Sequence, residues 1–151
     1  MDEIEVEVSF GEGVSGEAIA PERIERAVRH VLAAEGMERA EISVALVGDE
    51  EISDLNVDYL SHEGPTDVLS FALHEAGEPP LGDVYLGVDQ AARQAGEFAA
   101  ALDEELLRLA IHGTLHVLGY DHPAGAGRTR SRMFARQEEL LRQVLAAERG
   151  A

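Results

Sequence analysis

Short segments with the periodicity of β-strands alternate along this chain with longer segments that have the periodicity of α-helices. Apolar and polar residues alternate in Ile4–Phe10 and again in Glu41–Val47, as they do in strands with one buried face. Between these two segments, from Pro21 onward, apolar residues recur every three or four positions until Gly36, which is typical of an amphipathic helix. This alternation predicts a protein in which helices pack against a sheet.

The rest of the chain continues the same alternation. Two further strands are predicted at Thr66–Leu73 and Asp83–Val88, and we expect them to pair with each other. Four more helices are expected, three of them with an aspartate N-cap: from Asp49 to Tyr59, from Asp89 to near Gly96, from Asp103 to about Leu118, and from Thr129 to about Ala147. The predicted fold class is therefore α+β: a single small domain over residues 1–151, with one mixed sheet of about four strands and about five helices.

The composition bears on the compartment in which the protein works and on the charge of its partners. There is no cysteine, no apolar run long enough to span a bilayer, and the first residues, MDEIEVEV, are acidic where a signal peptide is basic. A cytoplasmic protein without membrane contact is the expectation. The net charge of −18 is uneven: residues 1–110 carry 26 acids and 6 arginines, whereas residues 111–151 carry 4 acids and 6 arginines. The simpler interpretation is a solvated acidic surface, and the alternative is that an anionic partner approaches the C-terminal quarter.

Three histidines lie within the eleven residues HGTLHVLGYDH, at positions 112–122. His112 and His116 are four apart on the predicted helix, so their imidazoles face the same side. Gly119 is placed to end the helix in a left-handed turn that returns His122 toward the other two. Three nitrogen ligands with an open fourth position are typical of catalytic zinc, although Ni²⁺, Cu²⁺ and Fe²⁺ accept the same donors. The spacing predicts a metal site on a helix and the following turn.

The stretch differs from the protease pattern H-E-x-x-H, in which a glutamate beside the first histidine acts as general base. Gly113 occupies that position here, which argues against ordinary peptide hydrolysis. Asp121, next to His122, is the nearest carboxylate in the sequence. We interpret it as a group that holds the second nitrogen of a histidine, with a role as general base as the alternative.

The histidine block closely resembles the H-G-x-L-H-L-x-G-Y-D-H signature of the YbeY family of bacterial ribosomal RNA maturation factors. Other segments resemble further blocks of the family in the same order, so that the resemblance spans roughly residues 40–145. These segments are LNVDYL (Leu55–Leu60), PTDVLSF (Pro65–Phe71), LGDVYL (Leu81–Leu86) and MFARQEELL (Met133–Leu141).

The resemblance implies a zinc-dependent, single-strand-specific endoribonuclease that acts in 3′-end maturation of small-subunit ribosomal RNA and in ribosome quality control. The ligands of one zinc ion per chain would be His112, His116 and His122, the residues that spacing selects independently. Ribosomal RNA and the ribosomal small subunit are the implied partners, and neither DNA nor a membrane is expected. The oligomeric state is not indicated.

One departure from the family pattern bears on activity. The family usually has an arginine, linked to its RNA cleavage, after the tyrosine of the LN…Y block, and this chain has Leu60 there. Loss of a bidentate phosphate donor weakens transition-state stabilisation unless another cation replaces it. Arg128, Arg130 and Arg132 are candidate replacements in substrate binding, with a solvated helix start as the alternative. Ser70, on the predicted third strand, is a further candidate RNA contact, although that strand's apolar residues favour a structural role.

Two other functions compete with the nuclease. Leu60 and the acidic surface both suit a metal-binding ribosome-assembly factor with weak or no cleavage, because phosphate neutralisation supplies much of nucleic-acid affinity. A metal-dependent hydrolase of another substrate, such as a peptide, is the third possibility.

Overall fold

The computed structural model describes residues 3–14, 16–60, 64–120 and 127–150, and the side chains of the last range from residue 132 onward. The described residues form four strands and five helices, as the periodicity predicts. In chain order the elements are β1 (Glu3–Phe10), α1 (Pro21–Ala34), β2 (Arg39–Val47), α2 (Asp49–Leu60), β3 (Val68–Ala72), β4 (Leu81–Gly87), α3 (Val88–Glu97), α4 (Leu102–Val117) and α5 (Gly127–Gly150).

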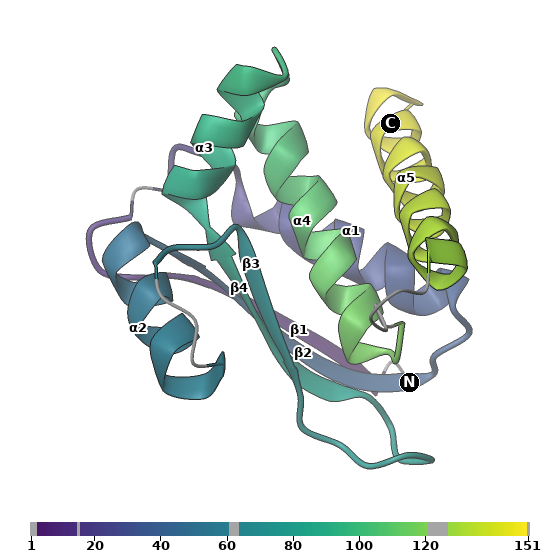
Figure 1. The fold of residues 1–151 in the computed structure, drawn as a ribbon. Coiled ribbons are helices and arrows are strands. Elements are labelled where there is room, and N and C mark those ends of the chain that lie inside the picture. The colour runs from purple at the N-terminus through teal and green to yellow at the C-terminus, as the bar shows by residue number, and fades with distance from the viewer. Residues whose placement is uncertain (1–2, 15, 61–63, 121–126, 151) are drawn as a thin grey trace.

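The four strands make one mixed sheet in the order β1-β2-β4-β3 (Figure 1). β1, β2 and β4 run parallel, with Val44 of β2 opposite both Val8 of β1 and Val84 of β4. β3 runs antiparallel to β4, and the two pair with Ser70 opposite Val84. The expected pairing of the third and fourth strands and the α+β fold class are therefore confirmed.

The two faces of the sheet are covered unequally. α1 and α4 lie on one face and α2 lies on the other, with α3 and α5 flanking α4 (Figure 1). The main core lies under α1 and α4, where the inward residues of β2 and β4 are fully buried. A small second cluster of Val47, Ile52 and Leu69 holds α2 against the opposite face. Most of the apolar burial is thus on the α4 side of the sheet.

α4 is the central helix of the molecule. It contacts β3 and β4 beneath it and packs against α1, α3 and α5 around it. Its residues from Leu106 onward are almost all buried: Leu106, Leu107, Leu109, Ala110, Ile111, Gly113, Thr114, Leu115 and Val117. Because interiors pack as densely as organic crystals, the orientation of α4 is fixed on every side. Its side chains that are not enclosed in the core are positioned just as firmly.

The aspartate N-caps expected from the sequence are wrong by one or two positions. Helix α2 begins at Asp49 itself, and the N-cap residues of α3 and α4 are Gly87 and Ala101. Asp89 caps a different helix, since its carboxylate accepts a hydrogen bond of 3.0 Å from the backbone N–H of Asp49. Aspartates in the first turn interact favourably with the helix dipole even when they do not cap, so they mark a helix start only approximately.

Helix α5 extends from Gly127 to Gly150, somewhat longer than the sequence indicates. Its buried face carries Met133, Leu140, Leu141 and Val144, together with one polar residue, Gln137. This face packs on α4 and α1. Among the described residues, no helix has both the length and the apolar run needed to cross a membrane.

Candidate metal centre

The imidazoles of His112 and His116 lie together on α4. Their ring centroids are 4.7 Å apart and the rings are inclined at 73°. Both side chains are half-buried, in a helix whose neighbouring residues are almost all buried. The i, i+4 spacing therefore brings two nitrogen donors to one place on a rigid element, as the sequence predicts.

The end of α4 directly after this pair is a glycine-capped turn. Gly119 has φ of +110°, in the left-handed region. Its N–H donates to His116 O and the N–H of Tyr120 donates to Leu115 O, each over 3.0 Å, which is the Schellman arrangement. The predicted role of Gly119 as a C-terminal cap is thus confirmed. Asp121 and His122 lie outside the described residues, and their predicted roles stay predictions.

The glycine between the two histidines faces the sheet. A Cβ atom at Gly113 would lie 2.6 Å from Val84 Cγ1 and 3.3 Å from Val68 Cγ2. Hence α4 approaches β3 and β4 more closely than a larger residue allows. Position 113, which carries the base in H-E-x-x-H, here packs directly against Val84 and Val68 of the sheet. A glutamate side chain at 113 would start in the core, which gives a structural reason for the missing base.

His112 has a hydrogen-bond partner that the sequence did not predict. Its Nδ1 lies 2.7 Å from Oε1 of Gln137, which is buried on α5 with 6% of its surface exposed. The Nε2 of Gln137 donates to the Glu138 carboxylate over 3.0 Å. A signal for Gln137 is present in the sequence, because it is the polar residue on the otherwise apolar stripe of the last helix. Its contact with a residue 25 positions away is not readable from that pattern.

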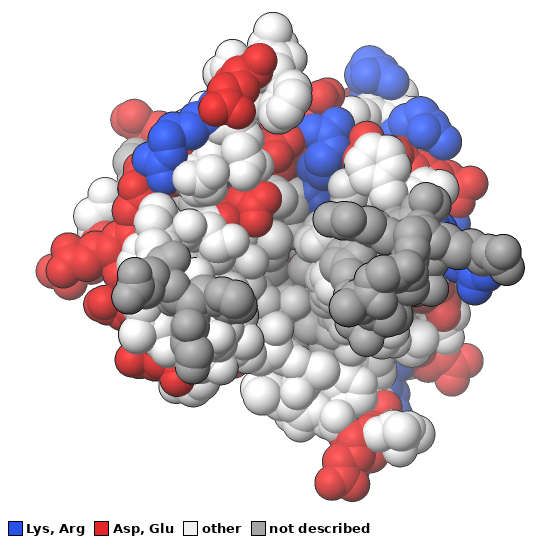
Figure 2. Space-filling view, viewed as in Figure 1, with Lys and Arg blue, Asp and Glu red and all other residues white. Residues whose placement is uncertain are grey.

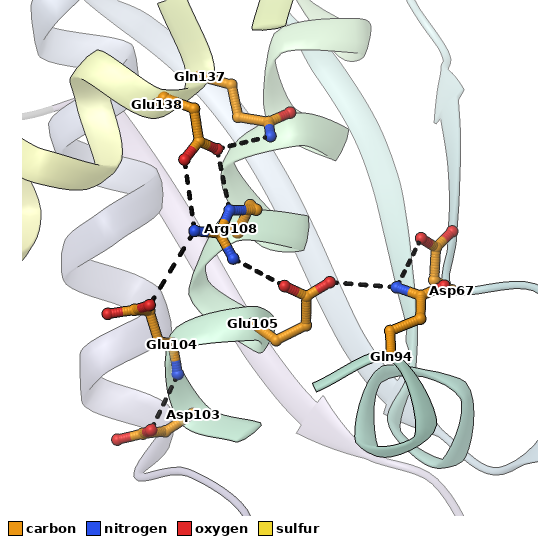
Figure 3. A network of polar contacts seen from close by, with 8 residues as sticks. All are labelled: Asp67, Gln94, Asp103, Glu104, Glu105, Arg108, Gln137 and Glu138. Atoms are coloured by element: carbon orange, nitrogen blue, oxygen red, sulfur yellow. Dashed lines mark hydrogen bonds and ion pairs between the residues drawn. The ribbon is translucent and has the colours of Figure 1, made fainter. Parts of the chain in front are cut away.

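Arg108 anchors these groups from one turn before His112 on α4 (Figure 3). Its guanidinium donates to both oxygens of Glu138, over 2.9 and 3.3 Å, and to Glu105 over 2.8 Å. Burial lowers the pKa of Arg108, but the hydrogen bonds to Glu138 and Glu105 outweigh it and leave the pKa above its ordinary value. Burial likewise raises the pKa of Glu138, and the bonds from Arg108 and Gln137 outweigh it and leave that pKa lowered. Both groups are therefore charged at neutral pH.

The network continues to α3 and to the start of β3. Gln94 donates through its amide nitrogen to Glu105 over 3.1 Å and to Asp67 over 3.2 Å (Figure 3). Because Glu105 also accepts from Arg108, three helices and the residue before β3 are linked through one set of polar contacts. The network meets the histidine pair through the contact of Gln137 with His112.

A cavity of about 300 Å³ opens beside His112. It is lined by Asp67, Val68, Glu105, Arg108, Leu109, His112, Met133, Phe134 and Gln137. Phe134 lines this cavity and is 60% exposed. Figure 2 shows this face of the molecule as hollowed in its middle, between α2 and α5, with few charges there and both acidic and basic side chains toward its edges. The histidine pair thus lies beside an accessible depression, as a reactive site requires.

The remaining predicted residues are placed only in part. Ser70 is half-buried on β3, on the strand face turned to α4. The side chains of Arg128 and Arg130 lie outside the described residues. Within the described residues there is no group of three histidine, aspartate or glutamate side chains arranged to hold a metal ion.

Leu60 ends α2 with 47% of its surface exposed. Arg108 lines the cavity, but its guanidinium is paired with Glu138 and Glu105. It therefore does not replace the phosphate-binding arginine that the family pattern has at position 60.

The fold and the site together define a small α+β protein with an imidazole pair at an open cavity on its central helix. Comparison with known proteins places it more closely. The family model described as Endoribonuclease YbeY matches residues 13–145. The chain belongs to this family, which confirms the resemblance of its motifs and the expected class of enzyme, an endoribonuclease.

Individual relatives agree with the family match. The chain is 46% identical over 133 residues to Endoribonuclease YbeY of Moorella thermoacetica, covering 80% of this chain and 84% of that one. It is 43% identical over 109 residues to Endoribonuclease YbeY of Aquifex aeolicus, covering 71% and 73%. Among solved structures, the solution structure of TM1509 from Thermotoga maritima matches with a TM-score of 0.65 and 28% identity, over 97% of this chain and 92% of that one.

Proposed function

We propose that this protein is a zinc-dependent, single-strand-specific endoribonuclease that matures the 3′ end of small-subunit ribosomal RNA and acts in ribosome quality control in the cytoplasm. The observation that carries the proposal is the paired imidazoles of His112 and His116 beside an accessible cavity, 4.7 Å apart on a rigid helix. The motif that contains them ends in His122, the proposed third ligand of one zinc per chain.

The residues present fit a zinc ion. Imidazole nitrogen is a preferred zinc donor, and the chain has no thiolate to compete. The contact of His112 Nδ1 with an amide oxygen leaves Nε2 as the nitrogen that carries the lone pair. When bound, zinc would supply a Lewis acid that polarises a phosphodiester and acidifies water. Asp121 would hold a histidine nitrogen or accept a proton.

The cavity suits an unpaired nucleotide more than a duplex. Phe134 lines the cavity and is an exposed residue, and exposed aromatic rings bind single strands by stacking on bases. We propose that Phe134 stacks on a base of the bound RNA. Arg128, Arg130 and Ser70 are the proposed contacts of the backbone, and ribosomal RNA within the small subunit is the proposed partner. A local cationic contact outweighs the net charge of −18 near a cavity, because exposed charges farther than about 10 Å are screened by salt.

A cleavage assay tests this proposal directly. The protein should cleave a single-stranded RNA and leave the corresponding duplex intact, lose activity on chelation, and regain it with zinc. His116→Ala should abolish cleavage, whereas His30→Ala, a histidine that pairs with Gln143 away from the cavity, should leave it unchanged. Cleavage that survives both chelation and His116→Ala would refute zinc dependence.

The specific alternative is a ribosome-assembly factor that binds metal but cleaves weakly or not at all. Leu60, in place of the family's arginine, is the observation that favours it. Such a protein would bind small-subunit particles equally well with and without metal and would leave the RNA intact. A peptidase of the H-E-x-x-H type is disfavoured by the packing of Gly113 against Val84, since the glutamate of that pattern does not fit at position 113.

A further inference from the structure

The amide of Gln137 stands between the histidine pair and a fixed carboxylate. On one side Oε1 lies 2.7 Å from Nδ1 of His112, and on the other Nε2 lies 3.0 Å from Oε2 of Glu138. Gln137 is 6% exposed, and both contacts are part-buried. A buried amide with both ends engaged has one favourable orientation.

The direction of these hydrogen bonds decides which nitrogen of His112 carries the proton. An ionised carboxylate only accepts, so the Gln137 end that faces Glu138 must be the donating nitrogen. The end that faces His112 is then the oxygen, which also only accepts. Nδ1 of His112 must therefore donate, and Nε2 must be the nitrogen with the lone pair.

The carboxylate that orients Gln137 is itself held in place. Arg108 donates to both oxygens of Glu138, in a two-point contact that fixes the plane of the carboxylate. Arg108 and His112 lie one turn apart on α4, whereas Gln137 and Glu138 lie on α5. The contacts therefore form a closed circuit: Arg108 joins α4 to α5 through Glu138, and Gln137 joins α5 back to α4 at the imidazole of His112.

We propose that Gln137 is a positioning residue for the metal centre: it holds His112 as the Nδ1–H tautomer, with Nε2 presented to the metal. This inference rests on the proposed function. Groups that hold the second nitrogen of a metal-bound histidine fix the tautomer and ring orientation, and their loss typically weakens metal affinity or activity about 10- to 100-fold. The circuit through Glu138 and Arg108 gives Gln137 this role from a helix outside the histidine motif.

Variants of Gln137 test the role through zinc affinity. Gln137→Met keeps the length of the side chain but removes both hydrogen bonds, whereas Gln137→Glu keeps an acceptor for His112. Zinc affinity of the full chain is measured by competition with a chromophoric chelator. We expect Gln137→Met to raise the Kd for zinc about 10- to 100-fold, and Gln137→Glu to bind zinc more tightly than Gln137→Met.

The chain offers a matched control on the same helix. Oε1 of Gln143 lies 2.7 Å from Nε2 of His30. This contact has the same length as the contact of Gln137 with His112, but it lies away from the histidine pair. Gln143→Met should leave the Kd for zinc unchanged. Wild-type affinity in Gln137→Met, or equal weakening by Gln143→Met, would overturn the proposal.

A second measurement needs neither a variant nor metal. Long-range ¹H–¹⁵N correlation spectra of the metal-free wild-type protein report the tautomer of each histidine. We expect His112 as the Nδ1–H form, and a predominant Nε2–H form would contradict the proposal. Because this spectrum is recorded without metal, it still tests the role of Gln137 if the protein binds no zinc and the proposed function fails.

Discussion

Replacing Gly113 by alanine tests whether the close approach of α4 to the sheet is what holds the histidine pair. The added Cβ would lie 2.6 Å from Val84 Cγ1, so reaching an ordinary contact of 3.4 Å requires a shift of about 0.8 Å. Val84 is fully buried and β-branched, so its methyl group has little room to rotate away. The shift must therefore come from the helix or the strand.

The expected loss of stability follows from two opposed effects. Overpacking of this kind costs about 1–3 kcal/mol. Alanine regains about 1 kcal/mol over glycine within a helix. Gly113→Ala should thus lower the free energy of unfolding by up to about 2 kcal/mol, and the unfolding temperature by up to about 8 °C for a chain of this size.

Urea unfolding followed by circular dichroism measures this change, and Gly96→Ala is the matched control. Gly96 also lies in a helix, α3, but a Cβ there meets nothing within 4 Å. That variant should leave stability unchanged or raise it by up to about 1 kcal/mol. If Gly113→Ala changes stability in the same direction and by the same amount as Gly96→Ala, the close helix–sheet contact is not a constraint.

Three further predictions concern the substrate and the sheet. Phe134→Ala should raise the KM for single-stranded RNA about tenfold, because one stacked base is lost, while Phe134→Tyr should keep a KM near that of the wild type. Equal KM values for Phe134→Ala and the wild type in steady-state cleavage assays would rule out stacking. Leu60→Arg should increase the rate of RNA cleavage, and an unchanged rate would mean that the arginine of the family has no counterpart role here. Glu41→Gln should raise the unfolding temperature at pH 7 and less at pH 4, because a hydrogen bond to and repulsion by Glu5, its cross-strand partner, raise the pKa of Glu41. A carboxyl group whose pKa is raised in the folded state destabilises the fold once it is ionised. The stability of the protein therefore falls as pH rises above about 4.3, the pKa of an unperturbed glutamate. Equal effects of Glu41→Gln at both pH values would contradict this assignment.

The elements of the fold were predictable because each has a strong local signal. Strand and helix periodicities of 2 and 3.6 residues locate every element, and Gly119 marks the end of α4 as its left-handed φ requires. Helix starts were placed less well, since Asp89 and Asp103 stabilise a first turn without capping it. The Asp89 carboxylate caps α2, a contact across 40 residues that no local pattern contains.

The candidate site was predictable only along the helix that carries it. The i, i+4 spacing of His112 and His116 dictates their proximity, because helix geometry alone brings them together. The groups that surround them come from other elements: Gln137 and Phe134 from α5, and Asp67 from the start of β3. Their approach depends on how α5 and β3 pack around α4, which is a tertiary property. The role of Gly113 is likewise visible only once Val84 lies beneath it.

The central claim is that three imidazoles hold one zinc ion and leave a coordination position for water or RNA. A crystal structure of the zinc-loaded protein, with anomalous diffraction recorded at the zinc edge, tests it most directly. We expect one zinc peak per chain, bound by His112 through Nε2, by His116 and by His122, with a non-protein atom completing the shell. A zinc ion bound elsewhere, or one enclosed by four protein donors, would contradict it.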